Sequence, residues 1–398
     1  MQEILPRLDV ETIVCRVREL LTQRRLWRGD GLYSRSFEER FAALCKRRFG
    51  ALTGNGSQAL EAAVDALDAL PGDEIIVPAF AFIAVAASVL QRGLVPVPVD
   101  VEETTFNLDA TRIAAAASER TRAIIVAHFA GCPCEMHAIL AAANSRDLPL
   151  IEDGAQAHFA KYGESTVGSF GLASCFSFQA AKTITSGEGG ILLTDDERVI
   201  RRTRAFINYG RDPDDCGYDH RFLSSNARLP EIAVALLLDQ LDCALDDNET
   251  RMRSYQDLAE TLQRIPELQL QQSTQSKSTH AHSLIPVLLP AWMSRSQRDA
   301  LVDSLKRQRW PVRAGYPLLT QTGIVRSARA RGLISADQES RIEEADRQVA
   351  VARRLAGSLV VFNHSILYRK PDELAGLAEH LQRFIGEQRA SESALCLS

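Results

Sequence analysis

The sequence has few cysteines for its length. Only eight occur in 398 residues, and their positions do not form the regular spacing of a disulfide framework. Cys132-Pro133-Cys134 is the closest pair, but no second Cys/His pair at ligand spacing accompanies it. The cysteines therefore indicate neither a disulfide-stapled secreted scaffold nor a metal site, and we expect incidental thiols.

Long apolar runs and an excess of positive charge are also missing. Acidic residues number 51 against 46 basic ones, for a formal net charge of −5. This balance does not favour nucleic acid or an anionic membrane as a partner. No run is long enough to span a bilayer, and the first residues carry acids and lack the apolar region of a signal peptide. We expect a cytoplasmic protein.

The usual phosphate-binding motifs of nucleotide enzymes are absent. Neither a lysine-carrying P-loop nor a GxGxxG fingerprint occurs, which disfavours a nucleoside triphosphate or a dinucleotide. A different turn, Gly54-Asn55-Gly56-Ser57, comes directly before a predicted helix. Free N–H groups and the positive end of that helix could bind a phosphate, although the same residues also form ordinary helix caps.

What the chain does contain is the composition of a globular protein, with 45% hydrophobic and 24% charged residues. Apolar segments typical of buried strands alternate with helical segments through the first part of the chain, at 74–77, 95–99, 123–128 and 148–151. This alternation predicts an α/β fold with a large, mostly parallel sheet covered by helices.

A smaller domain is expected after the large one. Composition changes near residue 264, and 271–282 is rich in Gln, Ser and Thr. Strands are predicted at 284–289 and 360–362, with a helix over 337–355 among others. We therefore divide the chain into a large domain, residues 1–263, and a smaller α+β domain, residues 264–398.

Polar or aromatic side chains follow several of the predicted strands. Phe82, His128, Asp153 and Lys182 each stand near the carboxyl end of an apolar run, where open α/β sheets bind their ligands. A strand-end Asp is more often a helix cap, and an arbitrary loop lysine is usually solvated. Together with the Gly-Ser helix start, however, these residues match what pyridoxal 5′-phosphate (PLP) requires: N–H groups for its phosphate, an aromatic face, a carboxylate and a lysine. His158, close to Asp153, is expected to pack locally.

With these residues in place, the sequence resembles the DegT/DnrJ/EryC1/StrS family of sugar and cyclitol aminotransferases, which have the type-I, aspartate-aminotransferase-like PLP fold. The resemblance covers roughly residues 25–390. It is carried mainly by Asn55–Leu60, Val77–Phe82, Ile151–His158 and Gly187–Gly190. Within the family, Ser177-Phe178-Gln179, 225–229 and Asn363-His364 look most like scyllo-inosose-type aminotransferases and 3-amino-5-hydroxybenzoate synthases.

The resemblance implies a role for each site residue. Lys182 would form the Schiff base with PLP and act as the catalytic acid and base, while Asp153 would pair with the pyridinium nitrogen. Gln156 would approach the ring hydroxyl, and Phe82 would stack on the ring. The remaining cofactor-binding positions, which include those that hold the phosphate, are Gly56, Ser57, Gln58, Ser177 and Asn226. Asn226 would serve the neighbouring subunit, so the resemblance also implies a homodimer with shared sites.

Several positions depart from the family pattern. Ala81 and Val85 replace the usual threonines, and Leu319 replaces a histidine common in the sugar enzymes. Tyr209 stands where a histidine is common, and Gly154 replaces an alanine or cysteine. All residues expected to bind the cofactor are present. These departures therefore leave the identity of the acceptor substrate open, and they do not affect the expected reaction type.

The resemblance implies a ping-pong transamination of secondary metabolism, such as antibiotic biosynthesis. L-glutamate or L-glutamine would donate an amino group, and a ketone on a sugar or cyclitol-like intermediate would accept it. An alternative is a PLP-dependent lyase that dehydrates and aromatises an amino-shikimate-type ring, and a third is a non-catalytic protein, which the intact cofactor set argues against. Trp27, Tyr316 and His364 could line the acceptor pocket or pack, and packing in the core is favoured for Trp27.

Overall fold

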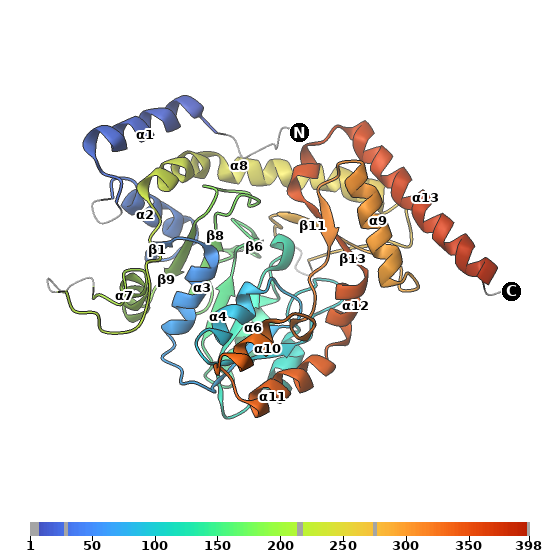
Figure 1. The fold of residues 1–398 in the computed structure, drawn as a ribbon. Helices are drawn as coiled ribbons and strands as arrows, with labels where there is room; N and C mark the ends of the chain where they lie inside the picture. Colours follow the sequence, from blue (N-terminus) through green and yellow to red (C-terminus); the bar gives the residue numbers. More distant parts are fainter. Residues whose placement is uncertain (1–7, 28–30, 213–217, 274–276, 396–398) are drawn as a thin grey trace.

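A seven-stranded sheet organises the first part of the chain (Figure 1). The structure is a computed structural model that describes residues 8–27, 31–212, 218–273 and 277–395. The strand order is β1-β9-β8-β5-β4-β2-β3. Strand β9 pairs antiparallel with both β1 and β8, and the other pairs are parallel. The bounds are β1 Phe49–Thr53, β2 Glu74–Pro78, β3 Val95–Val99, β4 Thr121–Ala127, β5 Leu150–Asp153, β8 Ala173–Ser177 and β9 Gly190–Thr194. The predicted mostly parallel sheet is confirmed.

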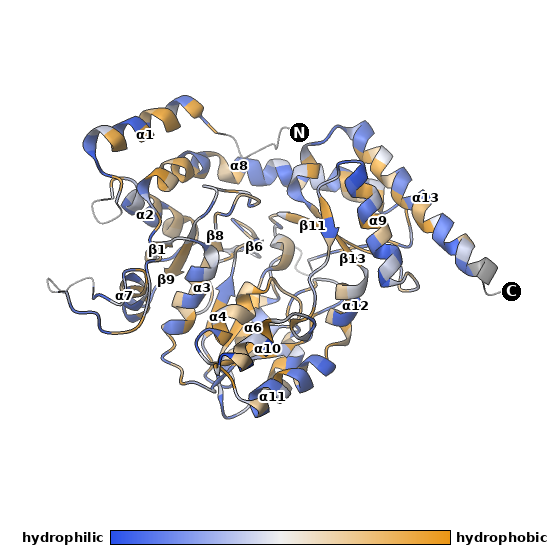
Figure 2. Cartoon of the chain, in the orientation of Figure 1, coloured by the Kyte–Doolittle hydropathy of each residue, from blue (hydrophilic) through white to orange (hydrophobic). Residues whose placement is uncertain are grey.

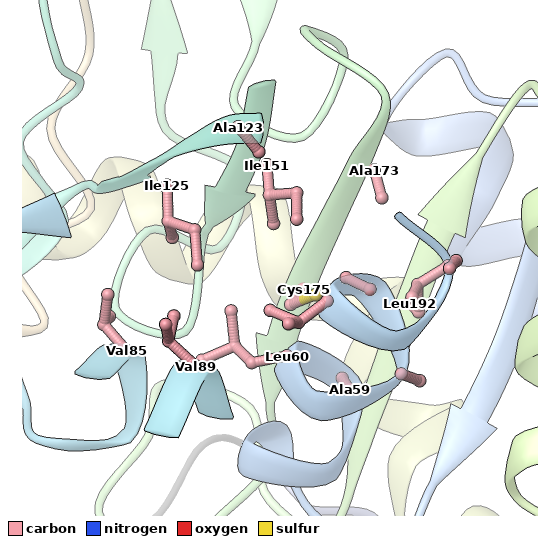
Figure 3. Packing of buried hydrophobic residues seen from close by; sticks show 14 of the residues in the cluster. Ala59, Leu60, Val85, Val89, Ala123, Ile125, Ile151, Ala173, Cys175 and Leu192 are labelled. Carbon is pink, nitrogen blue, oxygen red and sulfur yellow. The ribbon is translucent and has the colours of Figure 1, made fainter. Parts of the chain in front are cut away.

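Helices cover the two faces of this sheet. One face packs against α3 (Gly56–Asp65), α4 (Ala84–Leu90) and α7 (Glu197–Phe206), whose apolar side chains meet those of the strands in a single buried cluster (Figure 3). Leu60 and Val89 of the helices and Ile125 of β4 are fully or almost fully buried there. Burial of a side chain of this size contributes about 1.5–3 kcal/mol. This packing holds the start of α3 at the edge where β5 and β8 end.

The opposite face carries an aromatic core. Phe37 and Phe41 of α2 (Ser34–Leu44) pack with Phe176 and Phe178, and α8 (Glu231–Leu262) closes over them. Further helices and a short hairpin complete this part of the molecule: α1 Val10–Gln23, α5 Ile113–Ala116, α6 Met136–Asn144, β6 Lys161–Tyr162 and β7 Ser165–Thr166. Figure 2 shows mostly hydrophobic residues on the inner strands β8 and β9 and alternating character on outer helices such as α13.

A second, four-stranded antiparallel sheet follows, in the order β10-β11-β13-β12. Its apolar side chains form a separate cluster with α9, α13 and the end of α8. The bounds are β10 Gln269–Leu270, β11 Leu284–Leu288, α9 Arg295–Arg307, β12 Val312–Ala314, β13 Leu359–Asn363 and α13 Pro371–Leu395. None of the described helices is long and apolar enough to cross a membrane.

The helix predicted over 337–355 is two helices in the structure, α11 (Ala336–Arg347) and α12 (Ala350–Ser358). The carboxylate of Asp100 accepts hydrogen bonds from Val351 N (3.0 Å) and Ala352 N (2.8 Å). A buried carboxylate on these first-turn N–H groups starts a new helix where the sequence pattern reads as continuous.

Elements from the second half of the chain also pack on the large sheet. Val325 of α10 (Ile324–Ala330) and Ile342 of α11 form a buried cluster with Leu90 and Val95. The division of the chain at residues 263 and 264 remains a proposal, supported by the separate core of the second sheet.

Candidate active site

A cleft of about 790 Å³ lies where the ends of β5 and β8 meet the start of α3 and the second sheet. It brings together residues that are far apart in the sequence. All but one of the predicted site residues line it, namely Gly56, Ser57, Gln58, Phe82, Asp153, Gln156, Ser177 and Lys182. The exception is Asn226, which is exposed and does not line the cleft of its own chain.

The first corner of the cleft is a close approach of three backbone segments. A Cβ built on Gly56 would lie 2.6 Å from Ser177 Cβ, and one on Gly190 would lie 2.6 Å from Asn55 O. Asn55 caps α3 by accepting a hydrogen bond from Gln58 N (2.9 Å). The N–H groups of Gly56 and Ser57, the first two of the helix, have no intrahelical acceptor, and Ser177 adds a hydroxyl beside Gly56. Such a corner can accommodate an anion, and phosphate binding by Gly56, Ser57 and Ser177 stays a prediction.

Lys182 lies in a loop that is stabilised by hydrogen bonds between its own backbone groups. Phe178 N donates to Gly189 O (2.7 Å), Ala180 N donates to Gly187 O (2.9 Å), and Gly187 has a φ of 84°, which favours glycine. The side chain of Lys182 lines the cleft. The pKa of Lys182 is lowered to about 8, mainly by burial; the Asp153 carboxylate opposes this shift, and the Arg313 cation contributes to it. An amine with this pKa is far more often unprotonated at neutral pH than an ordinary lysine.

Asp153 is the last residue of β5, and its carboxylate is almost fully buried. Its Oδ1 accepts a hydrogen bond from Ala155 N (3.0 Å). Burial raises the pKa of Asp153, while this hydrogen bond and the charge of Lys182 oppose the rise. A buried carboxylate in this position is stabilised by a cationic ligand group.

An aromatic wall completes the cleft. Phe82 is 49% exposed although it follows a buried strand, because its ring lines the cleft. Its ring centroid lies 5.8 Å from that of Tyr316, and the hydroxyl of Tyr316 accepts a hydrogen bond from Gln156 Nε2 (3.2 Å). Tyr316, whose role the sequence left open, therefore lines the cleft.

Other residues considered from the sequence lie elsewhere. The prediction that Trp27 covers the core is wrong, because its side chain is 56% exposed. His364 is buried beside Tyr368, and burial lowers its pKa to about 4. His128 is also buried and bonds within the fold, with Nε2 3.2 Å from Glu152 Oε2. Neither histidine is among the cleft-lining residues.

The local packing predicted for His158 is confirmed. Its ring lies against Phe41, Phe176 and Phe178, and burial lowers its pKa to about 3. A ring with this pKa stays neutral at physiological pH and acts as part of the aromatic core. The same aromatic core leaves no room for a side chain at Gly154, since a Cβ there would lie 2.6 Å from the ring of Phe176.

Arg313 and Asn363 reach the cleft from β12 and β13 of the second sheet. Sequence reasoning missed Arg313, and it noted Asn363 only as part of the resemblance, without placing it in the site. Arg313 stands three residues before Tyr316, and its guanidinium carbon lies 4.3 Å from the Tyr316 ring centroid. A basic residue close in sequence to a candidate pocket aromatic was the only available signal, because the pairing of the two sheets is a tertiary property.

Comparison with known proteins agrees with this geometry. The model of the DegT/DnrJ/EryC1/StrS aminotransferase family matches residues 8–340. The chain is 32% identical to a 3-amino-5-hydroxybenzoate synthase of Amycolatopsis mediterranei, with 90% of this chain and 91% of that protein covered. It is 31% identical to an L-glutamine:scyllo-inosose aminotransferase of Streptomyces griseus, with 91% and 88% covered. The crystal structure of a 3-amino-5-hydroxybenzoic acid synthase superposes with a TM-score of 0.86 at 27% identity, covering 96% of this chain and all of the other.

Proposed function

Because the chain belongs to the DegT/DnrJ/EryC1/StrS family and is a PLP-dependent aminotransferase, we propose that it moves an amino group from L-glutamine or L-glutamate to a ketone on a sugar or cyclitol-like biosynthetic intermediate. The observation that carries this proposal is Lys182, an amine with a pKa of about 8 in one cleft with Asp153. The Streptomyces griseus relative is named for glutamine and scyllo-inosose, a cyclitol ketone, and this name supports the choice of substrates.

The residues of the cleft fit the cofactor. The corner of Gly56 and Ser177, which a Cβ on Gly56 would fill, suits the phosphate. The buried carboxylate of Asp153 suits the protonated ring nitrogen, and the exposed ring of Phe82 offers a face for stacking. When bound, PLP supplies an aldehyde for the amine of Lys182 and a ring that accepts electrons.

We assign the proton transfers to Lys182. Its Nζ accepts the proton from the α-carbon of the amino donor, and in the second half of the reaction returns a proton at the carbon that receives the amine. A pKa near 8 suits both tasks, because acid and base forms coexist near neutral pH. Asp153 would stabilise a positive charge at the ring nitrogen of bound PLP. Gln156, whose Oε1 accepts a hydrogen bond from Ala130 N (2.7 Å), would contact the ring hydroxyl.

We also propose a homodimer with shared sites. Exposed apolar side chains occur on α1, on the 218–223 segment and near the start of α8, including Val10, Val14, Leu21, Tyr218, Leu223 and Ile232. Large apolar side chains at 83% and 91% exposure, as for Tyr218 and Leu223, favour burial by a second copy. Asn226 lies in this region of the chain and, being exposed, is assigned to the partner's cofactor site.

A second candidate is the aromatising lyase. It is favoured by the relative named 3-amino-5-hydroxybenzoate synthase, which is matched over nine-tenths of the chain. Lys182 would again serve as the base, removing a ring proton before water is lost.

Separate half-reactions test the proposal. The visible absorbance of PLP-loaded protein should disappear when L-glutamine or L-glutamate is added, and keto-cyclitols or keto-sugars should then restore it. Lys182→Ala serves as the control that cannot turn over. If neither donor changes the absorbance while an amino-shikimate-type ring is aromatised, the lyase is correct and the transaminase proposal fails.

A further inference from the structure

The loop that carries Lys182 has two halves with different surroundings. Gln179, Ala181 and Lys182 line the cleft, whereas residues 183–185 are buried. Ile184 belongs to the aromatic core over which α8 closes. Lys182 therefore reaches the cleft from a loop whose second half is packed in the interior.

A glutamine of α8, Gln240, holds the buried half of this loop. Its Oε1 accepts a hydrogen bond from Thr185 N (2.8 Å), and its Nε2 donates to Thr185 O (2.7 Å). The same Nε2 donates to Leu236 O (2.7 Å), one turn earlier in α8, and this contact fixes the orientation of the amide. The side chain of Gln240 thus satisfies both backbone groups of Thr185, as a neighbouring strand does in a sheet.

These contacts are shielded from water. The exposed fraction is 1% for Gln240 and 7% for Thr185. A buried N–H or C=O group that loses its partner gains no replacement from solvent, so the loss is costly. The hydroxyl of Thr185 extends the connection, because it donates to Phe178 O (3.0 Å) and accepts from Gly187 N (2.9 Å). Gln240 therefore links both ends of the loop to α8.

The proposed reaction depends on where one atom of this loop lies. Nζ of Lys182 takes a proton from one carbon and returns a proton at another, which requires hydrogen-bond reach to both. A displacement of about 1 Å can slow such a step by about 100-fold. Lys182 stands three residues before Thr185. Resting on the proposed function, we infer that Gln240 is a positioning residue, whose hydrogen bonds to Thr185 hold Lys182 where its Nζ reaches the reacting carbons.

Gln240→Met tests this inference, because it keeps the length of the side chain and removes the amide. Two variants of the same helix serve as controls. Gln263→Met makes the same substitution at the exposed C-cap of α8. Leu258→Val loosens the core of the second sheet and does not touch the loop. An effect that results only from lost stability should therefore appear in Leu258→Val as well.

The first measurement needs no cofactor. Hydrogen exchange at the Thr185 amide is followed in the cofactor-free protein by mass spectrometry of the peptides that contain it. In Gln240→Met this exchange should be about tenfold faster, since the N–H has lost its buried acceptor. Gln263→Met should match wild type, and Leu258→Val measures the change that lost stability alone produces.

The second measurement follows the loss of cofactor absorbance when PLP-loaded protein is mixed with the amino donor. Gln240→Met should lower kcat for this half-reaction about 10–100-fold. The KM should change little, because the groups that bind the donor are untouched. Deuterium at the α-carbon of the donor should slow Gln240→Met more than wild type, since proton transfer by Lys182 becomes the slow step.

Gln240→Asn keeps the inference testable if Gln240→Met does not fold. It retains an amide but is one methylene shorter, so it either loses Thr185 or draws the loop towards α8. Both outcomes displace Lys182, and kcat should fall while the KM is maintained.

An unchanged kcat and isotope effect in the folded Gln240 variants would overturn the inference, as would losses that Leu258→Val reproduces. If wild type reacts with neither L-glutamine nor L-glutamate, the proposed function fails instead. Exchange at Thr185 would then still show whether Gln240 holds the loop.

Discussion

At the scale of single residues, the chemistry depends on how burial changes a few polar groups. Taken alone, Lys182 is one lysine in a loop, and the surrounding cleft lowers its pKa to about 8. Asp153 shows the converse, since burial raises the pKa of its carboxyl group. The two groups oppose each other's shifts because each favours the charged form of the other.

The pH dependence of cofactor uptake follows from these charges. The rate at which apoprotein gains the colour of bound PLP should rise with pH and level off above a midpoint near 8, because only the unprotonated amine of Lys182 reacts. Arg313→Gln removes a cation and should move the midpoint upward, whereas Asp153→Asn removes an anion and should move it downward. Stopped-flow absorbance measures the midpoint of the wild type and of both variants. A wild-type midpoint near the pKa of an ordinary lysine would show that burial does not lower the pKa of Lys182.

Gly56→Ala tests the anion-binding corner. The new Cβ would lie 2.6 Å from Ser177 Cβ, so the two segments must separate and the N–H groups lose their alignment. We expect PLP affinity to fall by about tenfold or more, since tenfold corresponds to only about 1.4 kcal/mol. A PLP titration followed by absorbance measures the change. The control is Gly376→Ala, where a Cβ meets open space; equal affinities of the two variants would contradict the role of Gly56.

At the scale of elements, the site depends on where helices begin. The start of α3 supplies the proposed anion-binding corner, and Asp100 sets the start of α12. The pattern over 337–355 reads as one helix because periodicity reports faces, and it does not report a capping carboxylate supplied from 251 residues away. The break is therefore a tertiary effect.

Asp100→Ala should lower the free energy of unfolding by about 1–3 kcal/mol, because buried N–H groups of Val351 and Ala352 lose their acceptor. Denaturant unfolding of the cofactor-free protein measures the loss. Asp109→Ala is the comparison, since Asp109 caps a short, exposed turn at Thr111, and a smaller loss is expected. Equal losses in the two variants would show that the Asp100 cap contributes no more to the free energy of unfolding than the exposed cap of Asp109 does.

At the scale of the whole molecule, two sheets with separate cores meet at the cleft. The large sheet contributes Asp153 and Ser177, whereas the second sheet contributes Arg313 and Asn363. A proposed third contributor is the neighbouring subunit, through Asn226. The site is accordingly a property of the assembled molecule.

Mixing two inactive variants tests the shared site. If Asn226 serves the partner, hybrids of Lys182→Ala and Asn226→Ala subunits contain one site with both residues intact. Equal mixing after reversible dissociation should then recover about a quarter of wild-type activity, as expected for random two-fold dimers. Light scattering checks the dimer. No recovery from confirmed hybrid dimers would place Asn226 in its own subunit's site, whereas an Asn226→Ala variant that is itself active would place Asn226 outside the site.

The sequence by itself determined the mostly parallel sheet, because buried strands read as apolar runs, and it pointed to strand-end residues that the structure brings together in one cleft. It did not reveal that Trp27 is exposed, that Asp100 breaks a helix, or that Arg313 lines the cleft. The last two result from contacts between residues distant in the chain. Local patterns record which face a residue prefers, whereas burial, charge pairing and the meeting of two sheets are decided only when the chain is folded.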